Sequence, residues 1–200
     1  MILPKSVYSL LLLAAASALI FLPPASHSRA KPAKTPGDHE GPFYPVVRQQ
    51  DEDNDLIHVD GRDQAALGDI LHLSGRVVNE DGQPLDQAVV EIWQTDPSGR
   101  YNDARDRSPG KRNPDFQYWG KAATREDGTY SFTTLVPGAY NPRPAHIHFK
   151  VWIDGRVRLT SQIYFKNKEE LNQPATPEPQ TVELRKNNAG EYEAFFQIVL

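Results

Sequence analysis

Cysteine is absent from this chain of 200 residues. Its absence excludes a disulfide framework, a lipid-modified cysteine, a cysteine nucleophile and a thiolate metal site. Any metal that this protein binds must therefore use nitrogen or oxygen ligands.

Positive charge is also in short supply. Lysine and arginine number 22 against 26 aspartates and glutamates, which gives a formal net charge of −4. Binding to nucleic acid depends on neutralising phosphates with basic side chains. The composition therefore predicts no nucleic-acid partner.

Long apolar runs are almost absent as well. The single exception is Val7–Leu22, which follows Lys5 and is too short to span a bilayer comfortably, since about 20 residues are needed. Small residues after it offer cleavage positions at Ser28 or Ala30. We predict that residues 1–30 are a signal peptide, that the protein is exported to the periplasm or secreted, and that the mature form has no membrane span. An uncleaved anchor is the alternative.

The rest of the chain predicts one all-β domain over residues 41–200, preceded by a flexible linker over residues 31–40 that is rich in proline and lysine. Apolar residues alternate with polar ones from Leu71 to Val78, as in a strand with one buried face. Similar segments occur at 89–94, 129–133, 146–153, 158–164 and 194–200. No stretch after Leu22 has a helical period. This pattern favours an antiparallel β-sandwich, with residues 102–115 and 166–179 as surface excursions.

Two histidines and two tyrosines form a candidate metal site. His146 and His148 are two apart at the start of an expected strand, which puts both imidazoles on one face while Ile147 and Phe149 point into the core. Tyr140 precedes them by six residues, and Tyr101 follows a Pro-Ser-Gly-Arg turn. Taken singly, the histidines could also lie on a solvated strand face, and the tyrosines could be ordinary loop aromatics.

Two tyrosine ligands would select the metal. A phenol has a pKa near 10, so ionising one at pH 7 costs about 4 kcal/mol. Only a strongly charged cation can offset this cost twice, and trivalent iron suits phenolate oxygen better than zinc does. The residues themselves thus point to Fe(III).

The motifs around these residues resemble those of the intradiol ring-cleavage dioxygenases, the family of protocatechuate 3,4-dioxygenase and catechol 1,2-dioxygenase. The first motif runs from Leu73-Ser74-Gly75-Arg76-Val77 through Val90-Glu91-Ile92-Trp93-Gln94 to Tyr101. The second is Tyr140 with Arg143-Pro144-Ala145-His146-Ile147-His148, and a Gly41-Pro42-Phe43-Tyr44-Pro45 opening is similar to the segment that leads into that core. The independent occurrence of these motifs in this order is improbable.

The resemblance implies roles for six residues. Tyr101, His146 and His148 would retain Fe(III), and Tyr140 would be the tyrosinate that leaves when substrate binds. Arg143 would lie beside the aromatic ring and stabilise negative charge, although a surface salt bridge is its alternative role. Gln162 matches a glutamine near that arginine, or else it is a plain strand residue. The reaction implied uses O2 to open a catechol-type diol to a cis,cis-muconate-type diacid.

Other observations limit the comparison. Only Asn141 and Pro142 separate Tyr140 from Arg143, where cytosolic members of that family carry a longer loop, so we expect a more open pocket, as in exported single-domain members.

The helical dimerisation region of catechol 1,2-dioxygenases has no counterpart in residues 31–60. A homodimer is possible, but the sequence does not settle the oligomeric state. Alternative functions are a non-catalytic β-sandwich binding module of the carboxypeptidase-regulatory or Cna-B kind, and a zinc or manganese hydrolase.

Overall fold

Strand β1, Ile70–Val78, shows how the alternating pattern becomes structure. Leu71, Leu73 and Val77 are completely buried, whereas Ser74 and Arg76 are exposed. One face of the strand therefore packs into the core and the other faces solvent. The expected strands at 129–133 and 194–200 show the same alternation, whereas those at 89–94 and 146–153 are buried along nearly their whole length.

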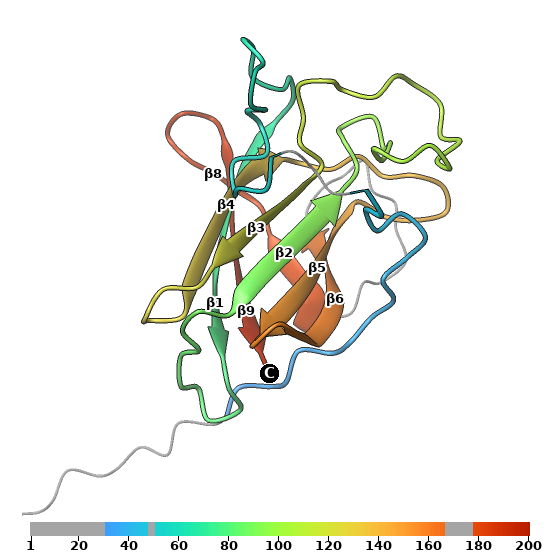
Figure 1. Ribbon diagram of the computed structural model, residues 1–200. Coiled ribbons are helices and arrows are strands. Elements are labelled where there is room, and N and C mark those ends of the chain that lie inside the picture. The colour runs from blue at the N-terminus through green and yellow to red at the C-terminus, as the bar shows by residue number, and fades with distance from the viewer. Residues whose placement is uncertain (1–30, 48–50, 167–177) are drawn as a thin grey trace, which may run out of the picture. The chain divides into compact units, whose positions relative to one another are not determined.

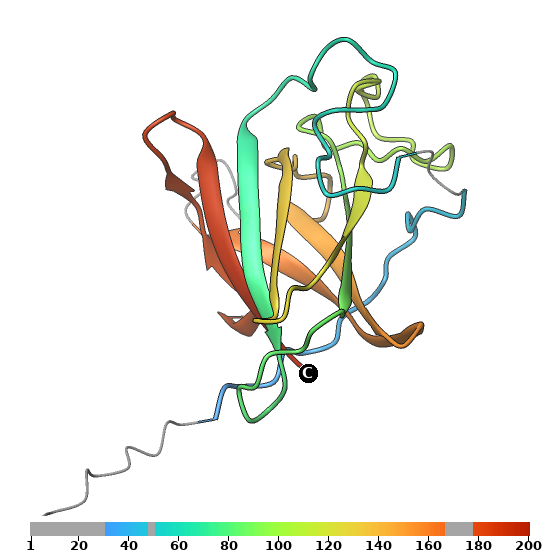
Figure 2. The same cartoon turned by 60° about the vertical axis from the view of Figure 1, so that its left-hand side comes forward.

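The computed structural model describes residues 31–47, 51–166 and 178–200. In the region 31–200, which forms one compact unit, two β-sheets lie face to face (Figures 1 and 2). The remaining elements are β2 (Val89–Gln94), β3 (Trp119–Ala123), β4 (Thr129–Leu135), β5 (His146–Ile153), β6 (Arg156–Lys166), a 3-10 turn η1 (Glu178–Gln180), β7 (Thr181–Glu183), β8 (Arg185–Lys186) and β9 (Tyr192–Val199).

The prediction of an all-β sandwich is confirmed, with a refinement in strand direction. One sheet has the order β4-β1-β9-β8 and the other β3-β2-β5-β6-β7. Most neighbours are antiparallel, but β9 runs parallel to β1 and β7 runs parallel to β6, so both sheets are mixed. Alternation of residues reports which face of a strand is buried and says nothing about its direction.

Residues 31–40, which the sequence predicts as a linker, contact the sandwich in the structure. Thr35 is buried, and its backbone N–H donates to the carbonyl of Val199 at 3.0 Å. The backbone N–H of Asp38 donates to the carbonyl of Thr160 at 2.9 Å. These residues pass along the outer side of the five-stranded sheet (Figures 1 and 2). The compact unit therefore includes them.

The predicted excursion over residues 102–115 contains no strand, as expected. Most of the second excursion, and the whole predicted signal peptide, lie outside the described residues. Among the residues that are described, no helix is long and apolar enough to cross a membrane. The loop that follows β2 and the loop that precedes β5 emerge at the same end of the sandwich (Figure 1).

Candidate metal centre

Strand β5 presents both histidines on the outer face of the five-stranded sheet. Ile147, Phe149 and Val151 fill the core from the inner face, as the period of two predicts. The outer face is not solvated, however, because His146 and His148 are each only 2% exposed. The side chain of Trp93, opposite His148 on β2, stacks on that imidazole with ring centroids 4.9 Å apart. The histidines are thus covered by other parts of the chain rather than exposed at the surface.

Tyr101 reaches the two histidines from the loop after β2. Its side chain is buried, and its backbone N–H donates to Oδ2 of Asp106 at 2.7 Å. The preceding turn depends on Gly99, which has a φ of 81°. A Cβ at Gly99 would lie 2.3 Å from the carbonyl oxygen of Ala139. Only glycine allows the Tyr101 loop to pack this closely against the loop that carries Tyr140.

Three of the predicted ligand atoms converge. Nε2 of His146 and Nε2 of His148 are 3.0 Å apart, and the hydroxyl of Tyr101 lies 3.4 Å and 3.1 Å from them, respectively. The donor nearest the two imidazoles is therefore a phenol, rather than the carboxylate that completes many zinc sites. In the described part of the chain, no group of three or more His, Cys, Asp and Glu side chains could hold a metal. A metal at this position would require the tyrosines.

Tyr140 completes the group from the loop before β5. Its ring centroid lies 5.5 Å from that of Tyr101 and 5.7 Å from that of His146. The phenol groups of Tyr140 and Tyr101 are close enough for each to affect the pKa of the other. Unlike Tyr101, the Tyr140 side chain is only partly buried. The two tyrosines thus differ in how firmly the protein encloses them.

The environment keeps both histidines neutral at pH 7. Burial lowers the pKa of His146 to about 4, and burial together with the neighbouring His146 lowers the pKa of His148 well below its usual range. Nδ1 of His146 donates to the carbonyl of Pro144 at 2.5 Å, which places the proton of the neutral ring on Nδ1 and leaves Nε2 unprotonated. A neutral imidazole with this tautomer is the form that ligates metals. Nδ1 of His148 is buried and has no hydrogen-bond partner among the residues that the structure describes.

The environment also disfavours an ionised phenol. Burial, with a smaller contribution from Tyr140, raises the pKa of Tyr101 well above its usual value, and burial raises the pKa of Tyr140 as well. Arg143 opposes both shifts but does not reverse them. Phenolates here would need a bound cation of high charge. The donor set of two neutral imidazoles and two phenols therefore suits ferric iron.

Arg143 lies next to Tyr140, to which its backbone is hydrogen-bonded. The connection from Tyr140 contains a cis peptide between Asn141 and Pro142 and is closed by backbone hydrogen bonds in both directions between Tyr140 and Arg143. The Arg143 guanidinium donates to Oε1 of Gln162 at 2.5 Å and to the hydroxyl of Tyr164 at 3.0 Å. Gln162 therefore lies beside Arg143. Its hydrogen bond to the guanidinium is a specific contact that an ordinary strand residue would not make.

Sequence reasoning missed several residues that surround the predicted ligands. Tyr164 contacts Arg143, and its hydroxyl donates to Oδ2 of Asp38 at 3.1 Å. Phe43 packs against Tyr101 with centroids 4.9 Å apart. The pairing of His146 with Tyr164 across β5 and β6 could have revealed the tyrosine, because period two puts Gln162 and Tyr164 on one face. Nothing in the local pattern places Asp38 there.

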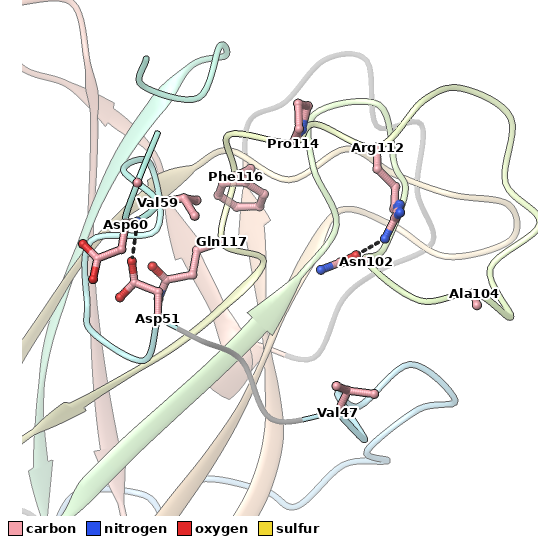
Figure 3. Close-up of a pocket in the computed structure, with 11 residues that line it drawn as sticks. Val47, Asp51, Val59, Asp60, Asn102, Ala104, Arg112, Pro114, Phe116 and Gln117 are labelled. Atoms are coloured by element: carbon pink, nitrogen blue, oxygen red, sulfur yellow. Dashed lines mark hydrogen bonds between the residues drawn. The ribbon is translucent and has the colours of Figure 1, made fainter. Parts of the chain in front are cut away.

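A cavity of about 1010 Å³ lies between the segment 51–61 and the loop 102–117. Figure 3 shows two hydrogen bonds at its edges, one from the Arg112 guanidinium to the Asn102 side chain and one from the backbone N–H of Asp60 to the Asp51 carboxylate. Asn102 follows Tyr101 in the chain, but none of the four predicted ligands lines this cavity. It is therefore distinct from the cluster of ligand atoms.

Comparisons with known proteins agree with this geometry. The family model described as Dioxygenase matches residues 39–184. The protocatechuate 3,4-dioxygenase beta chain of Burkholderia cepacia is 35% identical over 136 residues, which cover 64% of this chain and 58% of that protein. Catechol 1,2-dioxygenase 2 of Acinetobacter lwoffii is 35% identical over 147 residues, which cover 64% of this chain and 50% of that protein. The match thus spans about half the length of these curated relatives.

A solved structure is similar over nearly its whole length. It is the dioxygenase domain of a dioxygenase and carbohydrate-binding protein fusion from Streptomyces sp. SirexAA-E, with 28% identity and a TM-score of 0.66. The superposition covers 84% of this chain and 98% of that domain.

Proposed function

Because this chain belongs to the intradiol ring-cleavage dioxygenase family, we propose that it binds Fe(III) through Tyr101, Tyr140, His146 and His148 and opens a catechol-type diol with O2. The product would be a cis,cis-muconate-type diacid. Both oxygen atoms would enter the product, so the reaction needs no external reductant. The observation that carries the proposal is the convergence of the Tyr101 hydroxyl with the Nε2 atoms of His146 and His148 within 3.4 Å.

The ferric ion, when bound, would supply the positive charge that stabilises the phenolates and the ionised diol, and would activate the ring toward O2. The remaining contributions come from the chain itself. Both histidines are already neutral, and the His146 tautomer is fixed by the Pro144 carbonyl. The protein therefore presents them in the ligating form without a change of protonation.

The two tyrosines would have different roles. Tyr101 is almost completely enclosed and its backbone is held by Asp106, so we expect it to stay in place. Tyr140 is partly exposed on a loop, so we expect it to move when a diol binds. Its phenol oxygen could then accept a proton from a diol hydroxyl.

Arg143 would stabilise negative charge on the bound ring. Gln162 and Tyr164 fix its guanidinium by hydrogen bonds, so the charge is oriented before substrate arrives. The short connection from Tyr140 to Arg143 favours a site that is more open than in family members with a longer loop there.

The sandwich fold alone would also suit a non-catalytic binding module. What separates the two functions is the buried set of imidazole and phenol donors.

The test is to purify the protein with iron, measure its metal content and record the visible spectrum before and after adding catechol. We expect about one iron per chain and a tyrosinate-to-iron charge-transfer band that shifts with catechol. A colourless protein that takes up no iron after reconstitution would refute the proposal.

We also propose that the protein is exported, on the basis of the apolar run and small residues in 1–30. Fractionation of the source cells, with N-terminal sequencing of the recovered protein, tests this. Recovery of full-length protein from the cytoplasm alone would contradict it.

A further inference from the structure

The segment Asp38–Tyr44, which we call the strap, lies along the outer side of the five-stranded sheet (Figures 1 and 2). We infer that two buried charged residues of the sheet, Glu91 and Lys150, are positioning residues that hold the strap over the predicted ligands. The inference rests on the proposed function for the identity of the ligands. The contacts themselves are independent of it.

The middle of the strap packs directly against the predicted ligands. Gly41 has a φ of 75°, and a Cβ there would lie 3.1 Å from Cε1 of His148. The ring of Phe43 lies with its centroid 4.9 Å from that of Tyr101 and 6.5 Å from that of Tyr140. The strap thus covers His148 and both tyrosines, which explains why the histidines are buried on an outer sheet face.

The beginning of the strap holds the residues that orient Arg143. Nε2 of Gln162 donates to the carbonyl of His39 at 2.9 Å, which leaves Oε1 of Gln162 to accept from Arg143. The hydroxyl of Tyr164 donates to Oδ2 of Asp38 at 3.1 Å while accepting from Arg143. A displaced strap would therefore release both partners of the guanidinium.

Glu91 anchors the end of the strap. Its carboxylate is 4% exposed and accepts three hydrogen bonds, from the Tyr44 hydroxyl at 2.7 Å, from Nε1 of Trp119 at 2.6 Å and from Nε1 of Trp152 at 2.7 Å. The tryptophans belong to the sheet and Tyr44 belongs to the strap. One buried carboxylate thus joins the two.

Lys150 anchors the strap on the other side of Gly41. Its Nζ lies 2.6 Å from Oε2 of Glu40 and 3.3 Å from the centre of the Tyr44 ring. The ring of Trp93, which stacks on His148, is 5.6 Å from the same ammonium group. Lys150 is opposite Glu91 on the neighbouring strand, so the two anchors are adjacent on one sheet face. A buried charge is costly without partners, and strap residues supply partners to both.

The two anchored strap residues therefore flank the stretch that contains Gly41 and Phe43, the residues that contact the predicted ligands. Glu40 and Tyr44 are tied to the sheet, and Gly41-Pro42-Phe43 lies between them. Position and rigidity of this short stretch would decide how tightly the ligands are enclosed. Loss of Glu91 or Lys150 should therefore increase the mobility of the strap more than that of the four-stranded sheet.

Tyr44→Phe tests the inference, because it removes the hydroxyl that binds Glu91 and keeps the ring beside Lys150. Tyr130→Phe is the matched control, since its hydroxyl donates to the carbonyl of Phe196 at 2.8 Å in the other sheet. The measurements are amide hydrogen exchange of residues 39–44, the rate at which a chelator removes iron, and kcat and KM for catechol. A lost hydrogen bond to a charged group corresponds to roughly tenfold or more in a local opening equilibrium.

We expect Tyr44→Phe to increase exchange in the strap and iron release about tenfold, and to lower kcat more than it raises KM. Tyr130→Phe should leave all three readouts near wild type. Glu91→Gln should reproduce the Tyr44→Phe effects, and Tyr44→Phe remains decisive if Glu91→Gln does not fold. If strap exchange in Tyr44→Phe equals that in Tyr130→Phe, the inference is wrong. A wild-type protein that binds no iron would refute the proposed function, while the exchange measurement would still decide this inference.

Discussion

Acidification should destabilise the metal-free protein through His146. The pKa of this buried histidine falls from about 6.5 to about 4 on folding, mainly because burial disfavours the charged imidazolium. Above pH 6.5 both the folded and the unfolded chain carry a neutral imidazole, so its full contribution to stability is present. Between about pH 6.5 and pH 4 the unfolded chain binds a proton and the folded chain does not. Stability is therefore lost as the pH falls through this window.

The size of the effect follows from the pKa difference. A difference of one pKa unit corresponds to about 1.4 kcal/mol, so the shift of His146 predicts a loss of about 3 kcal/mol by pH 4. Ligand binding to the folded state would oppose this loss, so the measurement requires the metal-free protein with a chelator present.

Urea unfolding of the wild type and of His146→Gln at pH 7, 5.5 and 4 isolates this contribution. Carboxylates that titrate in the same range are present in both proteins, and so is His148, so their contributions largely cancel in the difference. We expect the wild type to lose about 3 kcal/mol more than His146→Gln between pH 7 and pH 4. Unfolding free energies that fall in parallel for the two proteins would refute the reasoning.

Three further variants test the predicted ligands and their surroundings. Tyr101→Phe should lose bound iron and the charge-transfer band while it keeps its fold, as metal analysis and circular dichroism would show. Arg143→Ala should retain iron and lower kcat for catechol by about 10²–10³, and a wild-type kcat would show that the arginine has no such role. Gly41→Ala should weaken iron binding in chelator titrations, because the added Cβ would lie against His148. Its positive φ also adds a backbone strain of about 1 kcal/mol. Gly61→Ala has a similar φ of 78° with open space around the added Cβ, so it controls for the strain alone.

Much of the fold could be predicted from local pattern. The alternation in residues 71–78 gave β1, and the spacing of His146 and His148 put both rings on one face with Ile147 in the core. The strand β3 was missed because Trp119-Gly120-Lys121 alternates too briefly to be distinguished from a loop. The local pattern does not predict that β9 runs parallel to β1, because the relative direction of two strands depends on contacts between residues far apart in the chain.

The burial of the site could not be predicted in this way. A histidine pair on the outer face of a sheet is expected to be solvated, unless another segment covers it. Here the cover is the strap, whose prolines, glycines and charges predict a linker by composition. Its order comes from Glu91 and Lys150, which are about 50 and 110 positions away along the chain. Composition within a window cannot report such a contact.

Asp96 shows how the two tyrosine loops depend on one another. Its Oδ1 accepts from the backbone N–H and the hydroxyl of Ser98, and its Oδ2 accepts from the hydroxyl of Tyr118 at 2.8 Å. Its carbonyl accepts from the backbone N–H of Gly99 and of Gly138, both at 3.0 Å. Gly99 leads to Tyr101, and Gly138 leads to Tyr140. A single buried residue thus joins the turns that lead to two phenols 39 positions apart in the sequence. The backbone of Tyr140 is also hydrogen-bonded to that of Arg143. We therefore expect Tyr140 to move by rotation of its side chain and by adjustment of Asn141 and Pro142, and not by displacement of the whole loop.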